Sequence, residues 1–195
     1  MKRSRTFEWD DPTPLWERVA GLSGLEVLYL MVSGELPQPP MARLMDIRLV
    51  EVEHGKAVFA STPGEYHYNP LGSVHGGFGA TLLDSAMGCA VHSALNAGDA
   101  YTTLELKINF LRPLTHATGL VRGTGTVIHA GRTTALTEGR IEDAAGKIYA
   151  FATSTCLLRR KRRRAVTPIA PPPFFASRSP IPRIPDPGSR LPAIS

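Results

Sequence analysis

The chain has 195 residues, of which 43% are apolar and 20% charged, enough for one sizeable core with short appendages. Its formal net charge of +5 comes from residues 159–195, which hold nine Lys or Arg and one acid, whereas residues 1–158 hold 13 basic and 16 acidic residues. The body is therefore mildly acidic, and its composition argues against a nucleic-acid-binding surface on the folded part.

The two cysteines, Cys89 and Cys156, lie within apolar runs and lack the spacing of a metal site. Such cysteines are typical of packed thiols in a reducing compartment. The basic N-terminus is followed by acids and proline instead of an apolar segment, and no run reaches the length of a membrane span. We therefore expect a cytoplasmic protein with no membrane partner.

Residues 1–40 predict a short helical arm. Thr13 followed by Pro14 has the pattern of an N-cap with proline at the first helical position. Further along, the sequence SGLE from Ser23 to Glu26 has the spacing of a capping box, and the apolar run VLYLMV follows it. This pattern predicts a second helix.

Residues 41–158 predict one α+β domain. The segment 45–62 alternates apolar and polar residues on both sides of His54-Gly55, which indicates a hairpin. Residues 76–96 run without proline and are apolar nearly all round, which predicts an enclosed helix of about five to six turns. Further strands are predicted at 101–113, 117–128, 132–142 and 147–158. This order lacks strand–helix–strand alternation, so we expect an antiparallel sheet of about five to six strands wrapped around one long central helix.

In the strand at 101–113, apolar residues alternate with polar ones. One face is therefore expected to be half-buried and the opposite face exposed. The half-buried face consists of Leu104, Leu106, Ile108 and Phe110, and the opposite face consists of Thr103, Glu105, Lys107 and Asn109.

Residues 159–195 hold nine of the seventeen prolines and no amphipathic period, so we expect a disordered, basic, proline-rich tail. Two interpretations of its basic run RRKRRR stay open: a solvated tail that aids solubility, or a contact with phosphates or an anionic surface. Nucleic-acid binding through this run would give an affinity that falls steeply with salt, and no nucleic-acid partner is expected.

Gly76 and Gly77 lie at the junction between a loop and the predicted long helix. Residues without a Cβ let a substrate carbonyl approach backbone N–H groups closely, and the first N–H groups of a helix lack intrahelical partners. Donors placed in this way can form an oxyanion hole. The alternative is a glycine pair that only allows the helix to begin in a tightly packed place.

Asp84 is a single carboxylate in the middle of the same helix. No cation lies three, four or seven residues from it, so a buried Asp84 would need another hydrogen-bond partner or a chemical role. The alternative is an exposed Asp on a solvated face. Eight helical residues separate Gly76 from Asp84, about 12 Å, so one carbonyl group cannot meet both within one chain. If the two cooperate, a two-fold axis must bring Gly76 of one subunit to Asp84 of the other.

The sequence N-P-x-G-x-V-H-G-G from Asn69, the aspartate nine positions after His75, and T-x-E-L-K-I-N-F-L-R-P from Thr103 together resemble the hotdog-fold acyl-CoA thioesterases of the phenylacetate-degradation type. The resemblance covers about residues 22–158. It implies a hotdog fold and hydrolysis of an acyl-CoA thioester to a free acid and CoA. It implies no cofactor and no metal.

The resemblance also assigns roles. Asp84 would be the catalytic carboxylate, as nucleophile or as general base, and Gly76 would donate its N–H to the thioester oxygen. Asn69 would position the substrate or the attacking water, and Thr103, preferred over the adjacent Thr102, would hold that water near Asp84. The remaining candidates for substrate binding are His75, Gly77 and Arg132, the last as a cation for the phosphates of CoA.

We therefore expect a thioesterase that forms dimers, and by further pairing tetramers, with sites shared between subunits. The alternative is a non-catalytic acyl-CoA-binding or sensing module of the same fold. His92, on the predicted helix, is interpreted as a surface or core residue. The acyl group, and the choice between CoA and an acyl-carrier protein as thiol, stay open.

Overall fold

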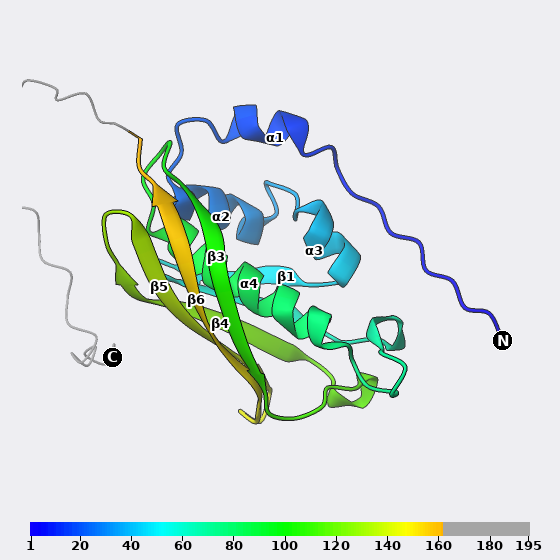
Figure 1. Cartoon of the computed structure of the whole chain (residues 1–195). Coiled ribbons are helices and arrows are strands. Elements are labelled where there is room, and N and C mark those ends of the chain that lie inside the picture. Colours follow the sequence, from blue (N-terminus) through cyan, green and yellow to red (C-terminus); the bar gives the residue numbers. More distant parts are fainter. Residues whose placement is uncertain (162–195) are drawn as a thin grey trace, which may run out of the picture. The chain divides into compact units, whose positions relative to one another are not determined.

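The computed structural model describes residues 1–161, and the predicted tail beyond them lies outside the described residues. Figure 1 shows the arrangement of the elements. The α-helices are α1 (Thr13–Arg18), α2 (Gly24–Ser33), α3 (Pro40–Met45) and α4 (Gly76–Ser93). The strands are β1 (Arg48–Glu53), β2 (Lys56–Ser61), β3 (Ala100–Phe110), β4 (Val121–Ala130), β5 (Thr134–Asp143) and β6 (Ile148–Arg159). Two short 3-10 helices, Glu65–His67 and His116–Thr118, lie in the connections.

The strands form one antiparallel sheet in the order β1-β2-β4-β5-β6-β3. The sheet curves around α4, and β3 runs along the helix at one edge (Figure 1). Leu82, Leu83, Ala86 and Met87 of α4 are fully buried between helix and sheet. The predicted α+β arrangement, an antiparallel sheet wrapped around one long helix, is confirmed.

Glycines in the sheet allow α4 to approach it closely. A Cβ at Gly125 of β4 would collide with the backbone carbonyl group of Ala86, and one at Gly123 would lie 2.7 Å from Cγ of Leu82. A Cβ at Gly139 of β5 would lie 3.0 Å from Cγ of Met87. A Cβ at Gly125 or Gly123 would require α4 or its side chains to shift, and one at Gly139 would press on Met87, so these three glycines allow α4 to lie deep in the sheet.

The helix boundaries confirm the capping box and correct two predictions. Glu26 N donates to Ser23 Oγ at 3.3 Å, and Ser23 N donates to Glu26 Oε2 at 2.7 Å. The prediction of Thr13 as an N-cap is wrong by one residue: the helix begins at Thr13, whose N–H donates to Asp11 Oδ1 at 2.9 Å. The long helix ends at Ser93 instead of residue 96, because the chain turns where Asp99 N donates to the Asn96 carbonyl.

The expected alternation in β3 is wrong at its first half. Thr103 pairs with Cys156 and Glu105 with Thr155, so Leu104 is the extra residue of a β-bulge and is 58% exposed. A bulge shifts the side-chain phase by one residue, which turns Thr103 toward α4 instead of toward solvent. Phe110 lies on the expected face, with its ring against α4, although it is 57% exposed.

No helix within residues 1–161 is both long and apolar enough to cross a lipid bilayer.

The end of the described chain is bound to Asp99. Arg160 follows β6 and forms an ion pair with Asp99 at 3.0 Å, and Lys161 N donates to Asp99 Oδ1 at 2.9 Å. Arg159 ends β6, and Arg160 and Lys161 are bound to Asp99, so these first three residues of the predicted tail 159–195 belong to the folded domain instead.

We expect Gly125→Ala to lower the free energy of unfolding by about 1–3 kcal/mol, because the added methyl group overpacks the contact between β4 and α4. Urea denaturation of the two proteins measures the difference. Gly131→Ala is the matched control, since a Cβ there lies 3.4 Å from the nearest atom, the Thr134 carbonyl oxygen. Equal stability of the two variants would contradict the close contact.

Candidate active site

At the start of α4, the backbone N–H of Gly76 has no acceptor within residues 1–161. His75 is the N-cap, and its Nδ1 accepts a hydrogen bond from the Gly77 N–H at 2.8 Å. The Phe78 N–H donates to the His75 carbonyl at 3.0 Å. Within residues 1–161, the Gly76 N–H has neither a backbone nor a side-chain acceptor. Of the two predicted donors, Gly76 is therefore available to a ligand and Gly77 is occupied by His75.

Asn69 organises the loop that leads into α4. Its Oδ1 accepts from the Leu71 N–H at 2.9 Å and from the Ser73 N–H at 3.3 Å, while its Nδ2 donates to Ser73 Oγ at 3.2 Å. The loop is tied further by Val74 N, which donates to the Leu114 carbonyl at 2.9 Å. The Asn69 side chain is thus engaged within its own loop, and it fixes the backbone that precedes His75 and Gly76.

Asp84 is half-buried on α4 and has one side-chain partner. Thr103 Oγ1 of β3 donates to Asp84 Oδ1 at 2.9 Å. The bulge at Leu104 makes this contact possible, because it turns Thr103 toward the helix. The structure therefore brings together the two residues that the sequence placed 19 positions apart, and the second carboxylate oxygen has no bonded partner within residues 1–161.

The groups around Asp84 are neutral at physiological pH. Burial raises the pKa of the Cys89 thiol to about 12, and the negative charge of Asp84 adds to this rise. Burial likewise raises the pKa of Cys156 and, well above its usual value, that of Tyr101. Protonated thiols are poor nucleophiles, so neither cysteine competes with Asp84 for a chemical role.

A pocket of about 330 Å³ lies beside the Gly76 amide. The ring of Phe110 forms part of its wall and packs on α4, since a Cβ at Gly76 or Gly79 would lie 3.1 or 3.2 Å from ring atoms. Arg112 also lines this pocket, and its guanidinium donates to the Ile148 carbonyl at 2.5 Å. Asp84 does not line the pocket, so within one chain this pocket contains only the amide half of the predicted site.

A second pocket, of about 390 Å³, lies on the other side of the α4 N-terminus and was not anticipated from the sequence. Aromatic rings form much of its wall, and the run EYHYNP before the glycines was the signal that could have indicated it. Its lining residues are Met45, Tyr66, His67, Tyr68, His75, Gly77, Phe78 and Thr81.

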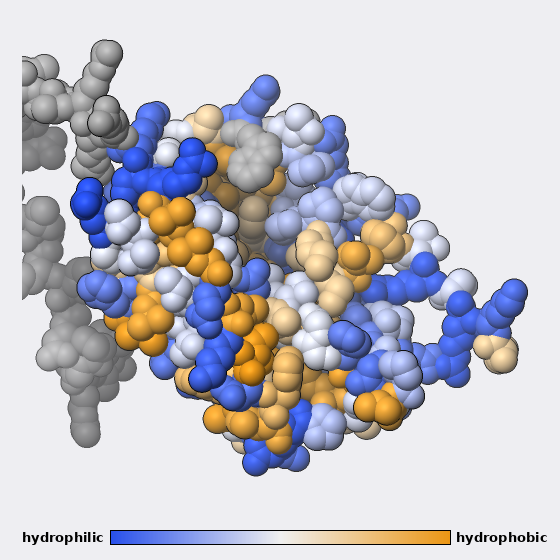
Figure 2. Space-filling view, viewed as in Figure 1, coloured by the Kyte–Doolittle hydropathy of each residue, from blue (hydrophilic) through white to orange (hydrophobic). Residues whose placement is uncertain are grey.

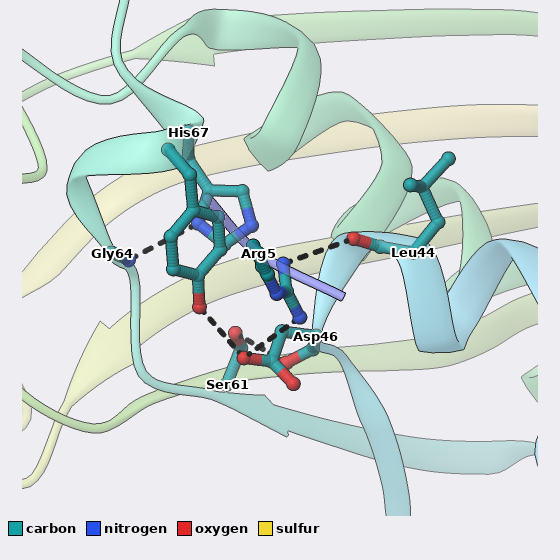
Figure 3. Close-up of polar contacts among 7 residues, drawn as sticks. Arg5, Leu44, Asp46, Ser61, Gly64 and His67 are labelled. Carbon is teal, nitrogen blue, oxygen red and sulfur yellow. Dashed lines mark hydrogen bonds and ion pairs between the residues drawn. The ribbon is translucent and has the colours of Figure 1, made fainter. Parts of the chain in front are cut away.

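Asp46 holds one wall residue of the second pocket, because the Tyr66 hydroxyl donates to Asp46 Oδ2 at 2.7 Å. Arg5 donates to the Leu44 carbonyl and pairs with Asp46, and Ser61 Oγ donates to the Asp46 carbonyl at 2.7 Å (Figure 3). His67 Nδ1 accepts from Gly64 N at 3.1 Å. Burial, and then the charge of Arg5, lower the pKa of His67, which keeps this ring neutral.

Arg132 is exposed in the turn between β4 and β5 and lines neither pocket. The structure of one chain therefore gathers Asn69, His75, Gly76 and Gly77 at one end of α4 and Asp84 with Thr103 in its middle. Within the described residues there is no cluster of three or more His, Cys, Asp or Glu that could hold a metal ion.

Residues 71–150 match the profile of the Thioesterase superfamily. A 1,4-dihydroxy-2-naphthoyl-CoA hydrolase from Listeria monocytogenes serotype 1/2a (strain 10403S) is 30% identical over 117 residues, which are 60% of this chain and 94% of that relative. This chain belongs to the thioesterase superfamily.

Two solved structures are similar to this chain in fold and in sequence. A phenylacetic acid degradation-related protein from Ralstonia eutropha JMP134 is 30% identical, with a TM-score of 0.60 over 67% of this chain and 98% of that one. A mutant of the phenylacetic acid degradation protein PaaI from Thermus thermophilus is 26% identical, with a TM-score of 0.56 over 63% and 100% of the two chains. The sheet around α4 is the hotdog fold, and the resemblance inferred from the sequence motifs is confirmed.

We expect Thr103→Val to lower kcat/KM for thioester hydrolysis about 10- to 100-fold, because a hydrogen bond to a charged group contributes about 1.5–3 kcal/mol. Thr102→Val is the matched control, since Thr102 is exposed on the other face of β3. Release of the free thiol from a thioester measures both variants. A larger loss for Thr102→Val than for Thr103→Val would contradict the observed register.

Proposed function

We propose that the protein hydrolyses an acyl-CoA thioester to a free acid and CoA at a site shared between two subunits. The observation that carries this proposal is the half-buried Asp84, held by Thr103, on the same helix as the unpaired Gly76 N–H. Superfamily membership supports thioester hydrolysis, and the similarity to a 1,4-dihydroxy-2-naphthoyl-CoA hydrolase supports CoA as the thiol.

The separation of the two half-sites requires the second subunit. Eight residues of α4 place Gly76 and Asp84 about 12 Å apart, too far for one carbonyl group to reach both. The open face of α4, formed by residues such as Ala80, Thr81 and Asp84, is only half-buried. A two-fold axis near the middle of this face would place two copies of α4 side by side and antiparallel, so that Gly76 of each copy meets Asp84 of the other.

The position of β3 at the edge of the sheet supports the proposed pairing of two subunits across this axis. It is 11 residues long and lies at the end of the sheet, where its outer N–H and C=O groups have no neighbouring strand within the described residues. Such an edge is a template for pairing with another chain. Apolar surface gathers over this edge in Figure 2, and its exposed apolar residues are Leu104, Phe110 and Leu111.

The proposed reaction uses few groups. The thioester oxygen accepts the Gly76 N–H, and the positive end of the α4 dipole stabilises the negative charge that develops on it. The Asp84 carboxylate of the other subunit takes a proton from water as the water oxygen bonds to the acyl carbon. The carbon–sulfur bond then breaks, and the departing CoA thiolate receives that proton. The carboxylate could instead attack the carbon itself, giving an anhydride that water cleaves.

The structure gives different support to the remaining predicted site residues. Asn69 and His75 shape the loop and the helix start, so we propose that they act by presenting the Gly76 amide. Arg132 is an exposed cation in a turn, and contact with the phosphates of CoA is proposed for it on that basis. A purely binding role of the whole site, the alternative function, is less well supported, because binding has no need of a half-buried carboxylate.

We expect Asp84→Asn to reduce the release of thiol from acyl-CoA at least about 100-fold while the protein stays folded. Ellman-type detection of free CoA measures turnover, and thermal unfolding with and without acyl-CoA measures folding and binding. Stabilisation of the unsubstituted protein by acyl-CoA without any thiol release would identify the binding module instead. Unchanged turnover in Asp84→Asn would remove the mechanism.

A complementation experiment tests the shared site. Asp84→Asn and Gly76→Pro each damage every site in their own homodimers, the second because proline at the first helical position removes the N–H donor. In a mixed dimer, one of the two sites combines an intact Gly76 with an intact Asp84. After unfolding and joint refolding of equal amounts, we expect activity to return to about one quarter of the wild-type level. If each site lies within one chain, mixing restores nothing.

A further inference from the structure

The outer face of the sheet carries exposed apolar side chains at one corner. Leu136 of β5 is 40% exposed and Leu157 of β6 is 36% exposed. Both point away from α4, because the residues beside them in each strand are buried in the cluster that packs on α4. Leu157 pairs with Thr134 and Leu136 with Thr155, so the two leucines are diagonal neighbours on adjacent strands. Ile128, in the bulge of β4 beside Leu136, is 52% exposed.

Cations surround the same corner. The turn between β4 and β5 lies against the end of β6, because Leu158 N donates to the Thr133 carbonyl at 2.7 Å. This contact places Arg132 of the turn beside Arg159, and both side chains are exposed without a hydrogen-bond or ion-pair partner within residues 1–161. Lys161 follows, and the sequence continues with three arginines at 162–164. Figure 2 shows hydrophobic residues next to strongly hydrophilic ones over this end of β3 and β6.

Few acids balance these cations within the described residues. The side chain of Asp99 is only 7% exposed and is paired with Arg160. On the outer face, the acids closest to Leu157 in the sheet register are Glu105 and Glu138, which lie two and four residues further along the strands, away from the turn. The corner therefore keeps an excess of positive charge, although residues 1–158 together carry more acids than bases.

This combination favours a lipid surface over two other partners. A second copy of the chain, related by a two-fold axis through this corner, would set the same cations against each other. A nucleic acid offers phosphates to the arginines but no apolar surface to the exposed leucines. An anionic bilayer offers both, since its headgroups attract cations and its acyl boundary accepts apolar side chains.

We propose that this corner of the sheet is a docking surface for an anionic phospholipid bilayer. Binding of this kind needs no membrane-spanning segment. The surface lies on the face of the sheet opposite α4, which carries the proposed active site, and the inference is independent of the proposed function. The docking surface consists of Ile128, Arg132, Leu136, Leu157, Arg159 and Lys161.

Vesicle binding by the full chain tests this surface. Vesicles of equal parts of phosphatidylcholine and phosphatidylglycerol are compared with vesicles of phosphatidylcholine alone, and co-sedimentation measures the partition coefficient. We expect binding to the anionic vesicles only, and weaker binding at higher ionic strength. The double variant Arg132→Gln/Arg159→Gln should bind about 20-fold more weakly, because each cation near an anionic surface contributes about fivefold.

Arg43→Gln/Arg48→Gln is the matched control for charge, since both arginines are exposed and Arg48 begins β1 at the opposite edge of the sheet. It removes the same charge and should bind the vesicles nearly as well as the unsubstituted protein. An equal loss in both double variants would assign the binding to net charge and overturn the docking surface. Full binding by Arg132→Gln/Arg159→Gln would overturn it as well.

Leu136→Thr/Leu157→Thr separates a bilayer from other partners. We expect at least about a tenfold loss of vesicle binding, because two apolar side chains no longer enter the acyl boundary. Leu71→Thr/Leu120→Thr is the matched control, as these leucines are 90% and 50% exposed elsewhere. Unchanged vesicle binding in the first variant, or equally tight binding of the unsubstituted protein to duplex DNA, would overturn the bilayer as partner. A lower oligomeric state with unchanged vesicle binding would identify a second copy instead.

Discussion

The hydrogen bond from Thr103 to Asp84 is the contact on which the proposed site depends. It holds a half-buried carboxylate on a helix that offers it no cation, and it leaves the second carboxylate oxygen available for chemistry. The bond exists because β3 carries an extra residue, Leu104, which turns Thr103 inward. One bulge thus connects the register of the sheet to the hydrogen bond of the proposed catalytic carboxylate.

The depth of α4 in the sheet is the second condition. Gly123, Gly125 and Gly139 bring the helix against the strands, so that β3 reaches α4 along a line from Phe110 at the helix start to Tyr101 near its end. Glycines of α4 itself, Gly76, Gly79 and Gly88, accept those two aromatic rings. Close approach in a packed interior requires residues without a Cβ, and the contacts of Gly76 and Gly79 with Phe110 also border the pocket beside the Gly76 amide.

The site divides naturally into an electrophilic half and a basic half. The helix N-terminus with its loop supplies an N–H donor and positive potential, and the middle of the helix supplies the negative charge. In a single chain these halves are separated by two turns of helix, so only symmetry can unite them. Such an arrangement keeps opposite functions on one rigid element, and in the proposed dimer the second subunit would complete the active site.

The sequence alone was sufficient for the fold class, because the long apolar helix, the capping box at Ser23 and the alternating strands are local patterns with short-range causes. It also indicated Gly76 and Asp84, since a helix-start glycine pair and an unpaired carboxylate are unusual in apolar surroundings. The sequence could not reveal the bulge at Leu104, which depends on pairing with β6, a strand that begins 38 residues beyond β3. Nor could it show that His75 occupies the Gly77 N–H, or that Tyr101 lies over Gly88. These contacts join residues through the packing of a strand or a loop against a helix, and such packing is decided only when the whole sheet closes around α4.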